Sequence, residues 1–126
     1  GLDFQLLGIG GNGHIGFNEP VNENAISCAD FQALPTRIVK LDKLTLQTNA
    51  QLTANNDLES VPSSAVTLGM SGILKAKKVI LLACFSEQTK PLTKIKSGKI
   101  TPELPASFLL EHLDTEIIYT GDQIQF

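Results

Sequence analysis

Residues 4–20 have the sequence FQLLGIGGNGHIGFNEP, which joins a short apolar run to a loop rich in glycine. The run from Phe4 to Ile9 is bounded by glycine and predicts a buried strand. In open α/β sheets, ligands bind just beyond the carboxyl ends of the strands. Glycine lets a ligand approach the backbone closely, so this loop predicts a cradle of N–H groups for a small polar ligand. We expect Gly10, Gly11 and Gly13 to bind the substrate there.

His14 is the best acid–base candidate of the chain, because the reference pKa of histidine lies near neutrality. Glu19 follows five residues later and is placed to orient and tune the imidazole. The competing interpretation of this spacing is that His14 caps a turn and Glu19 is solvated. The pattern GxGxxG at residues 8–13 also satisfies the dinucleotide fingerprint, but that fingerprint must open a helix, which Pro20 disfavours.

Strands and helices are predicted to alternate along the rest of the chain. Strands are expected at 36–41, 65–68, 79–85 and 116–120, and helices at 43–52, 73–76, 87–96 and 106–112. The segment 79–85 is apolar at every residue, as parallel sheets covered on both faces require. Ser86 is the predicted N-cap of the helix that follows it, and the irregular segment 21–34 is a candidate lid. The alternation predicts an α/β domain with a mainly parallel sheet.

Composition excludes several classes of function. The 126 residues are 42% hydrophobic, enough for one modest domain with a core. The net charge of −3 and the lack of a basic stripe or arginine cluster argue against a nucleic-acid partner. No apolar stretch is long enough to span a bilayer, so we expect no membrane partner and a cytoplasmic location.

The two cysteines and the second histidine are not expected to carry out chemistry. Cys28 and Cys84 are too few for a disulfide framework. Cys84 lies in the apolar run and is expected in the core. Cys28 has no neighbouring histidine or cysteine, which disfavours a metal or a thiol nucleophile, so no metal is expected. His112 falls in the last turn of a predicted helix, where a cation complements the helix dipole, and is expected to be structural.

The string GNGHIGFNEP at residues 11–20 closely resembles the signature of the glucosamine/galactosamine-6-phosphate deaminase (isomerase) family. Further matches follow in the family's order as PTRI, VPSSAVTLGM, KVILL and PASFL, at 35–38, 61–70, 78–82 and 105–109. The resemblance covers nearly the whole chain and implies a three-layer, Rossmann-like α/β domain. Family members are about twice as long, so residues 1–126 are expected to be the C-terminal portion of one such domain, truncated at the N-terminus.

The resemblance implies that an amino-sugar 6-phosphate becomes a ketose 6-phosphate with loss of ammonia. His14 would open the sugar ring by moving a proton to or from the ring oxygen, and Glu19 would support it in a relay. The position of Asn12 is Asp in some members, so Asn removes an anionic neighbour and the pKa of His14 should be raised less. The implied partner is phosphorylated glucosamine or galactosamine, with no cofactor, and a homo-oligomer is compatible with the resemblance.

Two positions depart from the family pattern. Ungapped alignment puts Leu46 where a phosphate-binding arginine is expected, and Gln88 where a lysine is expected. Lys43 and Lys90 lie nearby, and Lys90, at a predicted helix N-terminus, is expected to contact the phosphate. In the family, the aspartate that takes the C2 proton and a phosphate-binding loop lie upstream, so neither is assigned to this chain.

Two alternatives remain from the sequence. Some bacterial transcriptional regulators carry a domain of this fold that senses a sugar phosphate without turnover, and loss of phosphate ligands would suit such a domain. Retention of both His14 and Glu19 argues against it, because a sensor needs no ring-opening machinery. A 6-phosphogluconolactonase shares the fold and a related glycine-histidine string, but lacks the continuation FNEP at residues 17–20.

Overall fold

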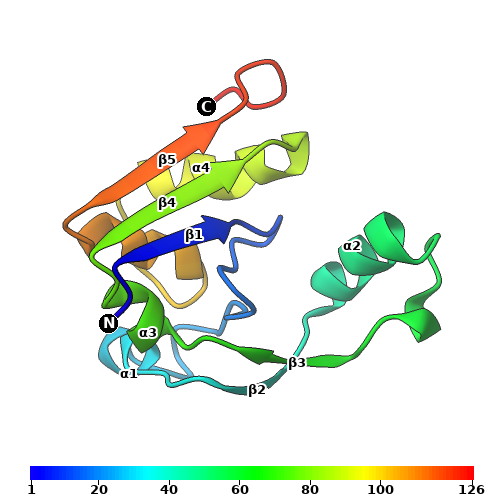
Figure 1. Cartoon of the computed structure of the whole chain (residues 1–126), viewed down its shortest axis with the longest axis horizontal. Helices are drawn as coiled ribbons and strands as arrows, with labels where there is room; N and C mark the ends of the chain where they lie inside the picture. The colour runs from blue at the N-terminus through cyan, green and yellow to red at the C-terminus, as the bar shows by residue number, and fades with distance from the viewer.

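The computed structural model describes all residues from 1 to 126 and is built on a three-stranded parallel sheet. Its strands are β1 (Phe4–Gly8), β4 (Lys78–Ala83) and β5 (Thr115–Tyr119), in the order β1-β4-β5. Their carboxyl ends point to the same side of the molecule (Figure 1). The mainly parallel α/β sheet predicted from the alternation of elements is therefore confirmed.

Helices cover one face of this sheet. They are α1 (Cys28–Gln32), α3 (Met70–Leu74), α4 (Thr89–Lys96) and the 3₁₀ helix η3 (Pro105–Glu111). Leu7 and Leu81 pack on this side with Leu92 and Phe108, all four buried in one apolar core. Burial of these side chains removes apolar surface from water and is the main source of the fold's stability.

The other face of the sheet is open in this chain. Phe4, Leu6, Leu82 and Ile118 alternate with the core residues along the strands and remain exposed. The expectation that segment 79–85 is covered on both faces is therefore not met within residues 1–126. Of the three layers of the predicted Rossmann-like domain, this chain supplies the sheet and one layer of helices (Figure 1).

Residues 37–67 form an arm that stands beside the carboxyl ends of β1 and β4. Strands β2 (Arg37–Lys40) and β3 (Ser64–Thr67) pair antiparallel as a separate two-stranded sheet. Between them the chain forms α2 (Lys43–Thr53) and the short 3₁₀ helix η1 (Leu58–Ser60). The predicted strands and helix of this region are present, but they extend away from the parallel sheet (Figure 1).

The irregular segment 21–34 packs under the core. It contains α1, whose N-terminus is capped by the Ser27 hydroxyl. Phe31 is fully buried, and its ring stacks on Phe108 with 5.2 Å between centroids. The prediction of a lid is wrong because this aromatic anchor holds the segment against the core. A helix of five residues is too short to show a clear apolar period.

The turn after β4 differs from prediction at two residues. Cys84 is exposed because β4 ends at Ala83. Ser86 does not cap α4, since the chain first makes a 3₁₀ turn, η2 (Ser86–Gln88). The side-chain oxygen of Gln88 accepts hydrogen bonds from the N–H groups of Cys84 and Phe85, at 2.7 and 2.8 Å. None of the helices combines the length and the hydrophobicity that a membrane span requires.

Candidate active site

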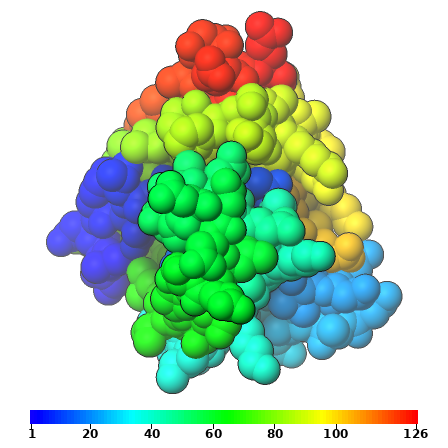
Figure 2. Space-filling model, turned by 90° about the vertical axis from the view of Figure 1, so that its right-hand side faces the viewer, coloured from blue at the N-terminus to red at the C-terminus, as the bar shows by residue number.

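A cleft of about 1240 Å³ opens beyond the carboxyl ends of β1 and β4. The glycine loop forms one wall and α2 forms the opposite wall, while residues of η2 and the start of α4 complete the rim. Figure 2 shows the teal and green arm lying across this end of the molecule, below the yellow-green residues that follow β4. The predicted site therefore lies where parallel α/β sheets bind their ligands.

His14 projects into this cleft with one ring nitrogen engaged and the other free. Its Nδ1 lies 2.8 Å from Oδ1 of Asn12. The same oxygen accepts the backbone N–H of His14 at 3.2 Å, so it acts as an acceptor and Nδ1 carries the proton. Nε2 has no hydrogen-bond partner in the chain and keeps its lone pair. The neutral ring is thus arranged to accept a proton from a ligand in the cleft.

Glu19 is held beside His14 by hydrogen bonds and is not solvated. Its Oε2 accepts from the Asn12 side-chain amide at 2.8 Å, and its side chain is only 12% exposed. The Oε1 atom lies 3.6 Å from Nδ1 of His14. The structure therefore brings together Asn12, His14 and Glu19, and contradicts the interpretation in which Glu19 faces water.

Thr45 completes this group and was missed by sequence reasoning. It lies in the first turn of α2 and is 3% exposed. Its hydroxyl donates to Oε1 of Glu19 at 2.8 Å and lies 3.2 Å from Nδ1 of His14. No local pattern marks this threonine, because it reaches the loop only when the arm folds beside the sheet.

Burial lowers the pKa of His14 below its ordinary value of 6.5. The negative charges of Glu19 and Asp42 oppose this effect but do not overcome it. Taking an imidazolium out of water is unfavourable, so desolvation favours the neutral ring. The result is a histidine that remains a base around neutral pH, although two carboxylates lie near it.

The glycines of the loop serve different purposes. A methyl group at Gly10 would overlap the imidazole of His14, so only glycine fits beneath the ring. Gly13 has a φ of +89° and lies outside the cleft lining, and its carbonyl accepts the N–H of Ala106 at 3.0 Å. The N–H groups of Gly11 and Asn12, which line the cleft, have no partner in the chain and are among the free donors of the loop.

Asn18 anchors the far end of the loop to the arm. Its buried side-chain amide donates to the carbonyl oxygens of Ile15 and Leu68, at 3.0 and 2.9 Å. Its Oδ1 accepts from the Arg37 guanidinium at 2.8 Å. Every polar atom of this side chain thus has a partner, which fixes the arm relative to the His14 loop.

Only Lys90 among the lysines and arginines lines the cleft, and its side chain is exposed at the rim. Leu46 and Lys43 do not line it. Gln88 is occupied by backbone groups, since its amide also donates to the carbonyl of Ile9 at 2.7 Å. No group of three or more histidine, cysteine or acidic side chains is placed to hold a metal ion.

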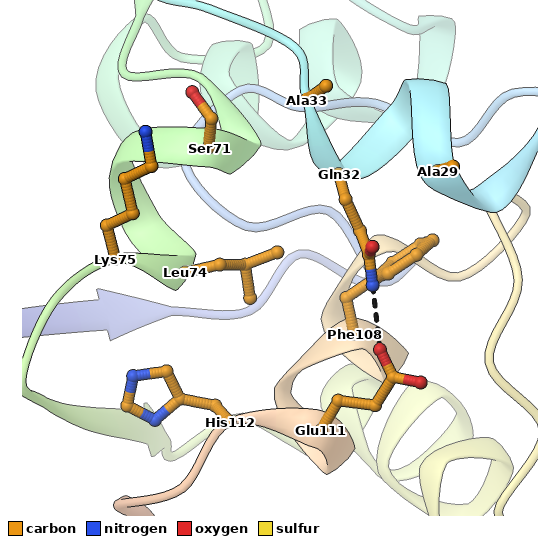
Figure 3. Close-up of a pocket in the computed structure, with 9 residues that line it drawn as sticks. All are labelled: Ala29, Gln32, Ala33, Ser71, Leu74, Lys75, Phe108, Glu111 and His112. Carbon is orange, nitrogen blue, oxygen red and sulfur yellow. Dashed lines mark hydrogen bonds between the residues drawn. The ribbon is translucent and has the colours of Figure 1, made fainter.

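A second, smaller cavity of about 560 Å³ lies between α1, α3 and η3 (Figure 3). His112 stands at its edge, and Gln32 and Glu111 bond across it at 2.7 Å. The His112 ring has no free nitrogen. Nε2 donates to the carbonyl of Ala76 at 2.7 Å, and Nδ1 accepts the N–H of Asp114 at 3.2 Å. The structural role predicted for His112 is supported, because protein groups engage both of its ring nitrogens.

Comparison with solved structures identifies the class of fold. The chain superposes on a monomeric glucosamine-6-phosphate deaminase with a TM-score of 0.83 and 36% identity, covering 96% of this chain and 46% of that one. It also superposes on the 6-phosphogluconolactonase of Trypanosoma brucei with a TM-score of 0.65 and 19% identity, covering 93% of this chain and 39% of that one. At that identity the second likeness shows the fold alone. The predicted Rossmann-like fold is confirmed.

Comparison with curated sequences is more specific. The chain is 44% identical over 118 residues to a glucosamine-6-phosphate deaminase of Clostridium acetobutylicum, covering 94% of this chain and 45% of the relative. It is 44% identical over 121 residues to one of Lysinibacillus sphaericus, covering 96% and 47%. The chain thus spans about half the length of the curated relatives it matches. No protein-family model matches it. The resemblance drawn from residues 11–20 is confirmed.

Proposed function

We propose that residues 1–126 are the C-terminal portion of a single amino-sugar-phosphate deaminase domain, and that the longer protein converts glucosamine 6-phosphate into a ketose 6-phosphate and ammonia. The observation that carries the proposal is the unpaired Nε2 of His14, on a ring that lines the cleft and is held at Nδ1 by Asn12. Sequence identity of 44% to a glucosamine-6-phosphate deaminase over 94% of this chain supports it. The lactonases are similar in fold only.

His14 is proposed to open the sugar ring. Opening a cyclic amino sugar removes a proton from the hydroxyl of the anomeric carbon and adds one to the ring oxygen as that C–O bond breaks. A neutral imidazole can accept the first proton at Nε2 and return it to the ring oxygen. Burial keeps the pKa of His14 low, so the ring is available as a base near neutral pH.

Asn12 and Glu19 are proposed to support this transfer without contacting the reacting atoms. Asn12 fixes the proton on Nδ1 and so selects the tautomer with a free Nε2. Glu19 holds the amide of Asn12 and offsets the charge that appears on His14 during transfer. The base that removes the C2 proton is not assigned to any residue of this chain.

The substrate is proposed to contact the loop and the rim of the cleft. The free N–H groups of Gly11 and Asn12 can donate to sugar or phosphate oxygens. Lys90 is the proposed cationic contact to the phosphate, with Gly10 admitting the ring of His14. Gly13 supports the loop from behind, through its contact with the segment around Ala106.

Ammonia release by the full-length protein tests the proposal. The protein is supplied separately with glucosamine 6-phosphate and galactosamine 6-phosphate, and ammonia is measured against time. Release from the first confirms the proposal, and release from the second alone changes the substrate epimer. Binding of either sugar without ammonia release would favour the sensing alternative.

A further inference from the structure

We propose that Thr45 is a positioning residue that sets the spacing between His14 and Glu19. Its hydroxyl, carried by the first turn of α2, stands between the carboxylate and the imidazole and keeps the ring directed at Asn12. The role in positioning is independent of the proposed function, whereas its consequence for catalysis rests on it.

The way Thr45 uses its hydroxyl distinguishes it from other helical threonines of the chain. The hydroxyls of Thr53 and Thr93 donate to the carbonyl oxygens four residues earlier, at 2.6 and 2.8 Å. Such back-bonding is a common local hydrogen bond of threonine within a helix. Thr45 instead donates to Oε1 of Glu19 at 2.8 Å, on a loop 26 residues upstream.

The geometry around Nδ1 of His14 shows what the hydroxyl does. Nδ1 lies 2.8 Å from Oδ1 of Asn12, 3.2 Å from Oγ1 of Thr45 and 3.6 Å from Oε1 of Glu19. Because the Thr45 proton is directed at Glu19, a lone pair of the hydroxyl faces the N–H of His14. The carboxylate is thereby engaged by a neutral donor and makes no direct hydrogen bond to the imidazole.

Few charges face this ring. Glu19 comes from its own loop, and Asp42 comes from the N-cap of α2. Glu87 and Lys90, from η2 and α4, line the same cleft. The cleft residues of β1 and β3 are uncharged. The arm therefore places both the Asp42 charge and the buried Thr45 hydroxyl near His14. The way the arm packs against the loop thus affects the pKa of His14.

Loss of the hydroxyl leaves Glu19 short of a donor. The nearest replacement is the N–H of His14, and a direct bond between them favours the imidazolium. We expect Thr45→Val to raise the pKa of His14 by about one, which is about tenfold tighter proton binding. His14 would then be protonated, and unable to act as a base, over part of the pH range in which the wild-type imidazole is neutral.

Titration of His14 by NMR tests this directly in the full-length protein. Histidine is labelled with ¹⁵N, and the His14 signals are assigned by their loss in His14→Gln. The pKa is compared among wild type, Thr45→Val, Thr45→Ser and Thr45→Ala. Ser keeps the hydroxyl, and Ala removes it with little change in size. If Thr45→Val fails to fold, the difference in the His14 pKa between the Ser and Ala variants still shows the effect of the hydroxyl.

The proposal expects a raised pKa in Val and Ala, and a wild-type value in Ser. Thr93→Val is the matched control, because it removes a helical threonine hydroxyl that bonds only to its own helix. An unchanged pKa in Thr45→Ala, or an equal rise in Thr45→Ser, overturns the proposal.

A kinetic measurement separates this proposal from the deaminase activity. If the protein releases ammonia, the acidic limb of its kcat/KM profile should move to higher pH in Thr45→Val and return in Thr45→Ser. The titration needs no substrate. A raised pKa without any ammonia release would therefore support the role of Thr45 and reject the proposed function.

Discussion

The two histidines occupy opposite situations in one fold. Nδ1 of His14 is hydrogen-bonded to Asn12, whereas Nε2 has no partner, and the ring lines a large cleft. Both ring nitrogens of His112 are hydrogen-bonded to protein groups, and this ring lies at the edge of a smaller cavity (Figure 3). This difference in pairing, more than proximity to a pocket, is the reason to propose a reactive role for His14 and a structural role for His112.

The partners of each ring explain this difference. Main-chain groups near the ends of α3 and η3, together with the Thr115 hydroxyl at 2.9 Å from Nδ1, engage both ring nitrogens of His112. The side chains of Asn12, Glu19 and Thr45 surround His14 and are joined to it and to one another by hydrogen bonds. The two regions should therefore respond differently to mutation.

Replacing each histidine gives the largest expected contrast. His14→Gln in the full-length protein should lower ammonia release by about 10²–10⁴-fold, because the acid–base group is lost. His112→Ala should keep the activity of the folded enzyme but lower the free energy of unfolding by about 1–3 kcal/mol, since polar partners lose their hydrogen bonds. Steady-state assays and urea denaturation measure the two effects. Equal loss of activity in both variants would abolish the distinction.

Gly10→Ala tests whether the position of the His14 ring matters. The added methyl group would overlap the imidazole and displace it. A displacement of about 1 Å can cost about 100-fold in rate, so kcat should fall to that extent. Gly121→Ala is the control, because nothing lies near its added methyl group. A Gly10→Ala enzyme with wild-type kcat would show that the ring need not sit where it is seen.

Replacing one lysine in each cavity tests which cavity binds the substrate phosphate. Lys90→Gln should raise KM for glucosamine 6-phosphate by about tenfold, because a charge-assisted hydrogen bond is lost. Lys75, which lines the smaller cavity, is the control, and Lys75→Gln should leave KM unchanged. Initial rates over a range of substrate concentration give both values. A wild-type KM in Lys90→Gln would remove this residue from phosphate binding.

The smallest expected effects are on the pH profile. Glu19 and Asp42 both raise the pKa of His14, with Glu19 the larger contributor. Glu19→Gln should move the acidic limb of kcat/KM to lower pH by about one pH unit, and Asp42→Asn by less. Movement to higher pH in Glu19→Gln would contradict the electrostatic role assigned to the carboxylate.

The free energy of unfolding should also depend on pH through His14. Because the pKa of His14 is lowered on folding, the unfolded chain takes up a proton first as the pH falls below about 6.5. This residue therefore destabilises the fold progressively from that pH down to its lowered pKa, and has no such effect above it. His14→Gln should be less sensitive to acid than wild type over that range, as urea midpoints at several pH values would show.

The sequence by itself determined the elements whose information is local. Asn12, His14 and Glu19 lie within eight residues, so one glycine-rich string reveals three members of the site. Parallel strands β1, β4 and β5 were predictable from apolar runs bounded by turn residues. The short helix α1 was not, because its one anchor, Phe31, has no periodic neighbours.

Tertiary structure alone decided which distant groups meet. Thr45 joins Glu19 across 26 residues, and Gln88 joins Ile9 across 79. It also decided that Gly10 serves the imidazole, that Gly13 faces the core, and that the pKa of His14 falls. Hydrogen bonding and desolvation depend on distance in space, and sequence separation does not reveal that distance until the arm and the sheet are placed together.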